Sequence, residues 1–247
     1  QIRQLRGAQI IIGTPGRIMD HMRRRTLTLN NLKTVILDEA DEMLNMGFLE
    51  DIQTILTEAP EVRQTVLFSA TMPSAIMSIT KQFQTNPEMI AVDKGQKTVD
   101  NISQFYYSVP QVAKNDALKL LLEYHRPKRS LIFCNTKKMV DELCSLLNDS
   151  GFKSIGLHGD LKQSQRNQVM RDFKSGRNSI LIATDVAARG IDVEDVEAVF
   201  NYDIPQENEY YIHRIGRTGR AGKTGASYTL AAGRAQLMKV HTLERFM

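Results

Sequence analysis

Short apolar or β-branched runs alternate with segments of helical period along this chain, and the alternation occurs twice in succession. It is typical of βαβ units, in which crossover helices join parallel strands. The predicted strands are residues 9–12, 34–37, 65–68 and 89–92 in the first half, and 131–134, 154–157, 179–183 and 198–200 in the second. The pattern therefore predicts an α/β fold with two parallel sheets.

Segments of helical period begin at Pro15, Met43, Pro73 and Thr136. The segment from Thr136 gathers its apolar residues on one face, and Gly151 suits its end. We expect such faces to cover the sheets. The predicted core residues are Met43, Met46, Phe48, Leu49 and Ile52 in the first half, and Met139, Val140, Leu143, Leu146 and Leu147 in the second.

The stretch 93–101 is polar and follows neither period, so it is predicted to link two domains. We place the boundary to give domains over residues 1–95 and 96–247. The first predicted strand lies close to Gln1, although a parallel sheet needs helices on both faces. We therefore expect the first domain to be truncated at its N-terminus and the second to be able to fold alone.

The composition excludes several classes of protein. No apolar run approaches the roughly 20 residues of a membrane-spanning helix, so we expect a soluble protein that contacts no membrane. Cys134 and Cys144 have no Cys or His at zinc-ligand spacing, and two buried, reduced thiols in a cytoplasmic protein are expected. The net charge of +4 and pI of 9.0 fit a surface that binds polyanions, as many unrelated proteins also do.

Two adjacent acids, Asp38 and Glu39, follow the predicted strand 34–37. Open α/β sheets bind ligands at the carboxyl ends of their strands. A carboxylate there can hold Mg²⁺ through water, and its neighbour can activate an attacking water. We assign these roles to Asp38 and Glu39. An equally supported interpretation is that the acids only favour the start of the next helix.

The segment 213–220, His-Arg-Ile-Gly-Arg-Thr-Gly-Arg, offers three guanidinium groups spaced by glycines. Such a loop can approach an anion closely, and an arginine at a γ-phosphate is worth about 10³ to 10⁵ in rate. A solvated basic loop is the alternative, which the regular spacing disfavours.

Gly222-Lys223-Thr224 imitates the end of a Walker A phosphate loop. The full pattern requires Gly where Arg217 stands, and no predicted strand leads into the segment. No other segment of these 247 residues has the pattern. The sequence thus shows the acids of an NTPase without a phosphate cradle.

Four further segments follow predicted strands. Residues 14–17, Thr-Pro-Gly-Arg, open a helix whose free N–H groups can bind phosphate, although simple capping is the commoner meaning. Residues 69–71 have the same ambiguity, and capping of the following helix is favoured. Thr184-Asp185 and residues 189–192 suit nucleotide or backbone contact.

Together these segments resemble the DEAD-box RNA helicases, which have two tandem RecA-like domains. The resemblance covers essentially the whole chain, and the spacing looks like that of bacterial members. The matching segments, in the family's order, are 14–17, 38–41, 69–71, 131–136, Gln163 with Arg166, 183–192 and 213–220.

The resemblance implies an RNA-dependent ATPase and helicase with ATP and Mg²⁺ between its domains. Asp38 would hold Mg²⁺ through water, and Glu39 would be the catalytic base. Arg217 and Arg220 would contact the γ-phosphate. Coupling of hydrolysis to domain closure is implied for Ser69, Thr71 and His213, and further nucleotide contacts for Asp41, Gly190 and Asp192, the last at the ribose.

RNA would be held by its backbone, without strong preference for sequence. The implied contacts are Thr14, Pro15, Gly16, Arg17, Asn135, Gln163, Arg166 and Thr184. We expect a monomer, with partners in ribosome assembly or RNA decay bound through flanking regions outside these residues.

The family's adenine-reading motif, its Walker A loop and its first RNA-contacting motif have no match in these residues. The chain alone is therefore predicted to be inactive as an ATPase. A non-catalytic RNA-binding module is the alternative, although it would not need Glu39, Arg217 or Arg220. A DNA helicase is disfavoured by the Asp-Glu-Ala-Asp form and by the Thr-Pro-Gly-Arg segment.

Overall fold

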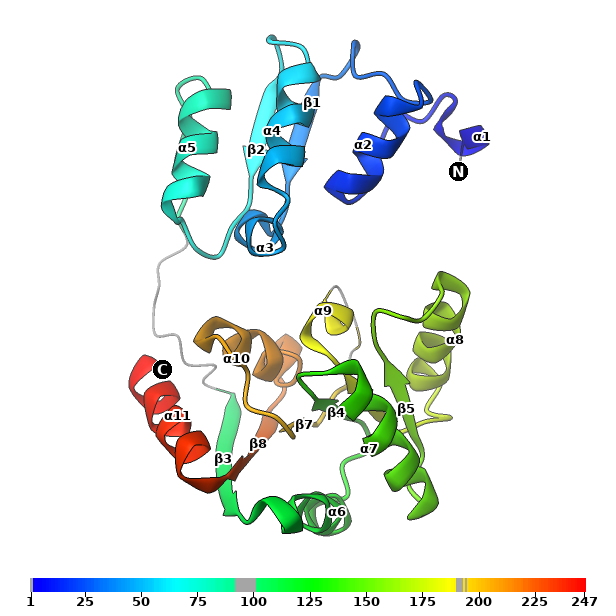
Figure 1. The fold of residues 1–247 in the computed structure, drawn as a ribbon, viewed down its shortest axis with the longest axis vertical. Coiled ribbons are helices and arrows are strands. Elements are labelled where there is room, and N and C mark those ends of the chain that lie inside the picture. Colours follow the sequence, from blue (N-terminus) through cyan, green and yellow to red (C-terminus); the bar gives the residue numbers. More distant parts are fainter. Residues whose placement is uncertain (1, 92–100, 190–192, 194) are drawn as a thin grey trace. The chain divides into compact units, whose positions relative to one another are not determined.

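The computed structural model describes residues 2–91, 101–189, 193 and 195–247 (Figure 1). The chain divides into two compact units, unit 1 from Gln1 to Val92 and unit 2 from Asp93 to Met247. The predicted boundary between residues 95 and 96, with most of the predicted linker, lies outside the described residues. The arrangement of strands and helices is α/β in both units.

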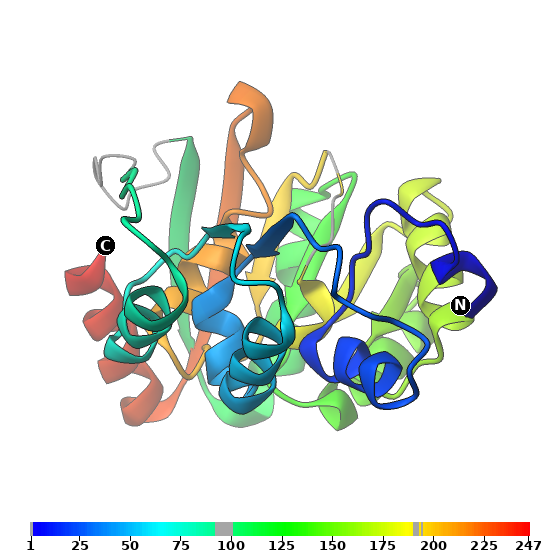
Figure 2. The same cartoon turned by 90° about the horizontal axis from the view of Figure 1, so that it is seen from above.

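Unit 1 is built on a parallel pair of strands with helices on one side (Figure 2). Its strands pair from Thr34 opposite Gln64 to Leu37 opposite Leu67. Ile36 and Phe68 are 60% and 56% exposed, so the face of the pair away from the helical core is open. The elements are α1 (Ile2–Leu5), α2 (Pro15–Arg23), β1 (Thr34–Leu37), α3 (Ala40–Asn45), α4 (Leu49–Glu58), β2 (Gln64–Leu67) and α5 (Ser74–Phe83).

Two predicted strands of unit 1 are wrong. Residues 9–12 and 89–91 are irregular, and Val92 lies outside the described residues. Ile12 and Ile90 are 94% and 84% exposed. An apolar run becomes a strand only where a neighbouring strand accepts its hydrogen bonds, and the described part of unit 1 pairs β1 with β2 alone.

The helix predicted from Met43 is two helices, because α3 ends at Asn45 and Gly47 has a left-handed backbone with φ 84°. Ile52 is buried as predicted, and Met43, Phe48 and Leu49 pack partly buried on the same core. Met46 is 47% exposed, so its prediction as a core residue is wrong.

Unit 2 contains a six-stranded parallel sheet with the order β3-β8-β7-β4-β6-β5. Helices α6 and α7 pack on one face, while α8 to α11 cover the other. The elements are β3 (Ile102–Val109), η1 (Gln111–Ala113), α6 (Lys114–His125), β4 (Ser130–Phe133), α7 (Lys137–Asp149), β5 (Ser154–Leu157), α8 (Gln163–Lys174), β6 (Ile180–Ala183), α9 (Asp185–Ala188), β7 (Ala198–Asn201), α10 (Asn208–Ile215), η2 (Arg220–Gly222), β8 (Gly225–Ala232) and α11 (Gly233–Phe246).

Four strands of this sheet, β4 to β7, lie within one residue of their predicted bounds. The prediction for α7 is also confirmed: the Thr136 side chain accepts a hydrogen bond from the Met139 N–H at 3.2 Å, and Gly151 has φ 87°. The edge strand β3 was not predicted. It pairs only with β8 among the described residues, six of its eight positions are exposed, and it carries no charged side chain.

None of the helices in the described ranges is long and apolar enough to cross a membrane. Both cysteines are free thiols. Cys134 is buried as predicted, whereas Cys144 is only partly buried, so the prediction that both are buried is wrong. Burial raises the pKa of Cys134, which keeps this thiol protonated and unreactive.

Candidate functional site

A strained turn joins β1 to α3 in unit 1. Glu39 has a left-handed backbone, with φ 51° and ψ 48°, which costs a non-glycine residue roughly 1–2 kcal/mol. Its N–H donates to Asp38 Oδ1 at 3.0 Å, and the Ala40 N–H donates to Phe68 O at 3.0 Å. Both acids are exposed. The turn therefore holds two adjacent carboxylates in water at the carboxyl end of a strand.

Asp41 joins this turn to the segment after β2. Its Oδ2 accepts hydrogen bonds from the N–H and hydroxyl of Thr71, both at 2.8 Å, and Oδ1 accepts from the Glu42 N–H at 3.0 Å. The Asp41 N–H donates to Ser69 Oγ at 3.2 Å, and that hydroxyl donates to Thr71 O at 2.6 Å. Partial burial would raise the pKa of Asp41, but these hydrogen bonds lower it overall.

Capping by Ser69 or Thr71, the favoured interpretation of residues 69–71, is wrong. The N-cap of α5 is Pro73, and it makes no side-chain capping bond. The Thr71 hydroxyl instead donates to the Asp41 carboxylate, and the Ser69 hydroxyl accepts from the Asp41 N–H and donates to Thr71 O. The segment thus links β2 to the acidic turn.

The start of α2 agrees with the sequence prediction only in part. Thr14 is the N-cap residue and Pro15 lies in the first turn, but the Thr14 side chain makes no capping bond. The backbone oxygen of Thr14 accepts from the N–H of Arg17 at 3.0 Å. Arg17 and Arg24 both pair with Asp20, and Gly16 is exposed. N–H groups of a first helical turn can bind an anion.

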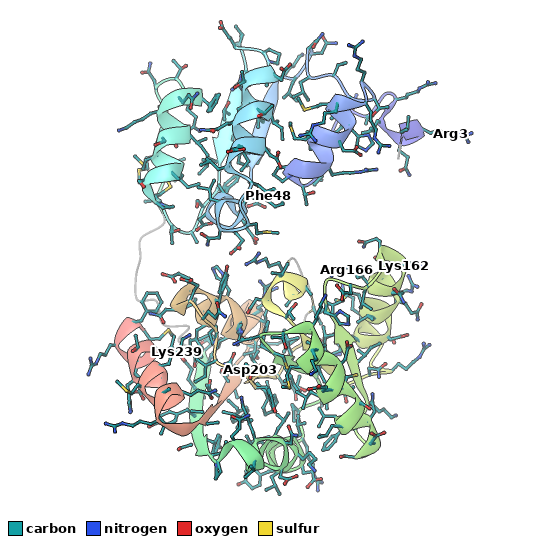
Figure 3. The ribbon with its side chains drawn as sticks, viewed as in Figure 1. Arg3, Phe48, Lys162, Arg166, Asp203 and Lys239 are labelled. Atoms are coloured by element: carbon teal, nitrogen blue, oxygen red, sulfur yellow. The ribbon has the colours of Figure 1, made fainter. Side chains whose placement is uncertain are left out.

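In unit 2, the carboxyl ends of three neighbouring strands carry polar residues. Asn135 follows β4, Thr184 follows β6 and Asp203 follows β7, and β4 lies between the other two in the sheet. Figure 3 shows Asp203 within unit 2, with Lys162 and Arg166 at α8. Carboxyl ends of parallel strands are where such sheets bind ligands.

Arg214 of α10 contacts residues at the carboxyl ends of these strands, and its side chain is 1% exposed. Its Nε and one terminal nitrogen donate to the two carboxylate oxygens of Asp185 at 2.6 and 2.8 Å. The same terminal nitrogen donates to Asn135 Oδ1 at 2.9 Å. The other donates to Asp203 O and, at 3.4 Å, to Asn201 Oδ1. A buried charge of this kind is tolerated because it is paired and hydrogen-bonded.

A second ion pair adjoins the first. Asp203 accepts from the Asn135 N–H at 3.0 Å and from Lys114 Nζ at 3.0 Å. Lys114 is 2% exposed and lies over the Tyr202 ring, 4.3 Å from its centroid. The Asn135 amide also donates to Ile204 O at 2.9 Å. Lys114 and Arg214 are buried, Asp185 and Asp203 are partly buried, and Asn135 is exposed. We call these five residues the polar network.

The glycine-rich segment after α10 folds back on its own helix. Arg217 Nε donates to His213 O at 3.2 Å, and Arg220 Nε donates to Gly216 O at 3.0 Å. His213 and Arg220 are exposed. Gly219 has φ 67°, a conformation that favours glycine. Arg217 and Arg220 therefore stand on a compact turn after α10. Arg214, the first of the three guanidinium groups predicted to lie on an anion-binding loop, is instead buried within α10, so that part of the prediction is wrong.

The remaining predicted residues are distributed around α8 and α9. Gln163 begins α8 and donates to Asn167 Oδ1 at 2.9 Å, while Arg166 donates to Ala187 O at 3.2 Å and so ties α8 to α9. Thr184 is the N-cap residue of α9. Gly190 and Asp192 lie outside the described residues.

The network itself was not predicted as a unit. Asp185 and Arg214 both lie in segments that the sequence singles out, yet their pairing depends on the order of strands. Lys114 gave no signal, because a lysine at a helix start is usually exposed.

The acidic turn also suits a metal ion that comes with a ligand. No group of three or more His, Cys, Asp or Glu able to hold a metal occurs among residues 2–91, 101–189, 193 and 195–247. In nucleotide sites, Mg²⁺ keeps several waters and binds one or two carboxylates together with substrate phosphates. Asp38 and Glu39 fit this mode of binding. They do not form a metal site made of protein ligands alone.

Comparisons with known proteins cover nearly the whole chain. The model of the DEAD/DEAH box helicase family matches residues 1–79, and that of the helicase conserved C-terminal domain matches residues 113–222. The chain is 51% identical over 239 residues to the DEAD-box ATP-dependent RNA helicase CshA of Bacillus subtilis (strain 168), which covers 96% of this chain and 48% of that protein. The chain belongs to the DEAD-box RNA helicase family.

Solved structures of DEAD-box proteins agree. The structure of S. cerevisiae Dbp5 bound to RNA and ADP BeF3 is 33% identical, with a TM-score of 0.87, and the match covers 97% of this chain and 63% of that one. A hypothetical ATP-dependent RNA helicase from Sulfolobus tokodaii is 39% identical, with a TM-score of 0.54, and the match covers 97% and 70%. The predicted fold class, RecA-like α/β domains with parallel sheets, is confirmed. The chain spans about half the length of the curated relatives it matches, 48% in the case of CshA.

Proposed function

We propose that this chain provides most of the catalytic and RNA-binding residues of an RNA-stimulated ATPase that separates short RNA duplexes or remodels RNA–protein complexes. The observation that carries the proposal is the left-handed Glu39 beside Asp38 at the end of β1. Strained residues held by their surroundings cluster at functional sites, and here the strain fixes two exposed carboxylates.

For the reaction, Asp38 would hold Mg²⁺ through water, and a bound Mg²⁺ would neutralise charge on the ATP phosphates. Glu39 orients the attacking water and takes its proton. Arg217 and Arg220 donate to the γ-phosphate, whose transferred group carries its charge on three oxygens in the transition state. Gly190 and Asp192 contact the nucleotide, the latter at the ribose.

Coupling of hydrolysis to domain closure belongs in this proposal to Ser69, Thr71 and His213. Asp41 already binds both hydroxyl residues in unit 1. A shift of the turn at residues 38–41 therefore moves residues 69–71, and a shift of residues 69–71 moves the turn. Asp41 acts on the nucleotide through this link and through the turn it closes.

RNA as the ligand is supported by the Dbp5 structure, which contains RNA. In this proposal the RNA is held by its sugar-phosphate backbone. The α2 start supplies backbone N–H groups and Arg17, and α8 supplies Gln163 and Arg166. Thr184 and Asn135 contribute at the strand ends of unit 2. The proposed contacts in full are Thr14, Pro15, Gly16, Arg17, Asn135, Gln163, Arg166 and Thr184.

The test is ATP hydrolysis with and without single-stranded RNA, measured on this chain and on a fusion that places the preceding segment of B. subtilis CshA before Gln1. We expect RNA-stimulated hydrolysis from the fusion and none from the chain alone, because no segment of the 247 residues has the Walker A pattern. A folded fusion that binds RNA without hydrolysing ATP would favour the RNA-binding module.

Within the fusion, Glu39→Gln is expected to lower kcat at least about 100-fold, the lower range for loss of a general base, while RNA binding in the presence of ATP persists. Glu50→Gln is the matched control, since Glu50 is an exposed acid on α4 of the same unit. Unchanged turnover in Glu39→Gln would remove the role assigned to Glu39.

A further inference from the structure

The guanidinium of Arg214 is satisfied completely inside unit 2. Arginine has five N–H donors. Arg214 makes two hydrogen bonds to Asp185 and one each to Asn135, Asp203 and Asn201. These partners follow or end three different strands, β6, β4 and β7. One side chain on α10 therefore fixes the carboxyl ends of three neighbouring strands.

We propose that Arg214 is a positioning residue, which holds the RNA-contacting end of β6 and the nucleotide-contacting arginines in one fixed arrangement. Asp185 directly follows Thr184, and Arg214 directly follows His213 in the helix that leads to Arg217. The bidentate pair between Asp185 and Arg214 thus connects the two groups directly. This functional meaning rests on the proposed function.

Stability alone does not account for such a network. Replacing a buried ion pair by well-packed apolar residues is often neutral or stabilising, whereas removing one partner is costly. Planar, bidentate pairing does specify the relative position and angle of the two groups. Lys114 and Asp203 form a second ion pair, and Asp203 also accepts from the Asn135 N–H. The network therefore contains two cations and two anions.

Lysine at position 214 would keep the charge but cannot reproduce the geometry. An ammonium has three donors on one nitrogen and cannot bind both Asp185 oxygens and Asn135 as the guanidinium does. Because Arg214→Lys keeps the positive charge, unit 2 should still fold. Because it loses the bidentate geometry, the position of β6 should no longer be tied to that of α10. Arg177→Lys is the matched control, because Arg177 pairs with Asp172 on the surface, with 71% of its side chain exposed.

The first experiment needs no ligand. Asp185→Asn is introduced into the wild-type chain and into Arg214→Lys, and backbone amide NMR signals are compared. We expect Asp185→Asn to shift the Asn135 and Arg217 amides beyond their linewidths in the wild type, and to leave them in place when position 214 is Lys. Equal shifts in both backgrounds would overturn the proposal. If Arg214→Lys does not fold, Asp185→Asn alone decides, since unmoved amides at Asn135 and Arg217 would overturn it.

The second experiment measures RNA stimulation of ATP hydrolysis in the CshA fusion. Residues that couple two sites change coupling by 0.5–2 kcal/mol, so stimulation should fall roughly 2- to 30-fold in Arg214→Lys while the RNA concentration for half-maximal effect stays the same. Arg177→Lys should match the wild type. Full stimulation in folded Arg214→Lys would overturn the functional role. Absence of stimulation in the wild type would count against the proposed function, and the NMR comparison would then decide the inference.

Discussion

At the residue scale, Asp41 and Thr71 show how pairing of strands brings distant side chains together. Leu37 and Leu67 are partners in the β1–β2 register, and Asp41 and Thr71 each lie four positions further on. Their two hydrogen bonds lower the pKa of Asp41 against the opposing effect of burial. A lowered carboxyl pKa contributes stability that is present above the unfolded pKa and is lost as pH falls through the folded one.

Thr71→Val removes the hydroxyl donor and keeps the backbone N–H. We expect unit 1 to lose about 0.5–1.5 kcal/mol at neutral pH, the value of one ordinary hydrogen bond. The difference between wild type and variant should persist down to the ordinary Asp value of 3.8 and shrink at lower pH, as Asp41 is protonated. Urea unfolding from pH 7 to pH 2.5 measures it, with the exposed Thr57→Val on α4 as control. A pH-independent difference would contradict the assignment.

The acids, the hydroxyls and the arginines were predicted from the sequence, because each stands in a segment with its own spacing. Their partners were not. The Asp41–Thr71 contact depends on which strands pair, and the five bonds of Arg214 depend on the order β7-β4-β6. Neither is encoded in a local pattern.

At the element scale, the segment 217–220 is fitted tightly against the start of β8. A Cβ on Gly225 would lie 2.3 Å from Thr218 Oγ1 and 2.7 Å from the backbone nitrogen of Gly219. Thr218 is itself buried and donates to Val196 O at 2.5 Å. The close approach explains a glycine at the first position of a strand.

Gly225→Ala is expected to destabilise unit 2 by about 1–3 kcal/mol through overpacking and to move the Arg217 turn. Gly159→Ala is the control, since a Cβ there meets no atom within 4 Å. Urea midpoints of the two variants, with the amide spectrum of residues 217–220, measure the effect. Equal midpoints would mean that residues 217–220 move to accommodate the added Cβ without loss of unfolding free energy.

Strands with β-branched or apolar runs, such as β4 to β7, were predictable to within one residue. Strand β8 was not, because Gly225, Ala226 and Ser227 give it small residues of low strand preference. Its place between β3 and β7 comes from tertiary pairing. The helix after Met43 divides for a local reason, the left-handed Gly47.

At the scale of the whole molecule, the two units differ in how completely their sheets are covered. The sheet of unit 2 is packed on both faces, whereas the described part of unit 1 leaves one face of β1 and β2 open. Burial of apolar area is the main favourable term in folding. Unit 1 should therefore be the less stable of the two.

We expect urea to unfold the chain in two steps, unit 1 first. The chain has no Trp, so a single Trp placed in each unit reports on that unit alone. Phe83→Trp and Phe152→Trp are suitable, because each side chain packs partly buried against its unit's core. Midpoints that coincide for the two reporters would contradict independent unfolding.

The pairing of β3 with β8 also sets a waiting time during synthesis. Ile102 pairs with Gly225, which lies 123 positions later in the chain. At roughly 5–20 residues per second, a ribosome needs roughly 6–25 s to deliver the second strand after the first. Throughout that interval the nascent chain displays an uncharged, aromatic segment with no neighbour, which is the kind of sequence that associates between chains. Unit 2 can close only when its last strand has left the ribosome.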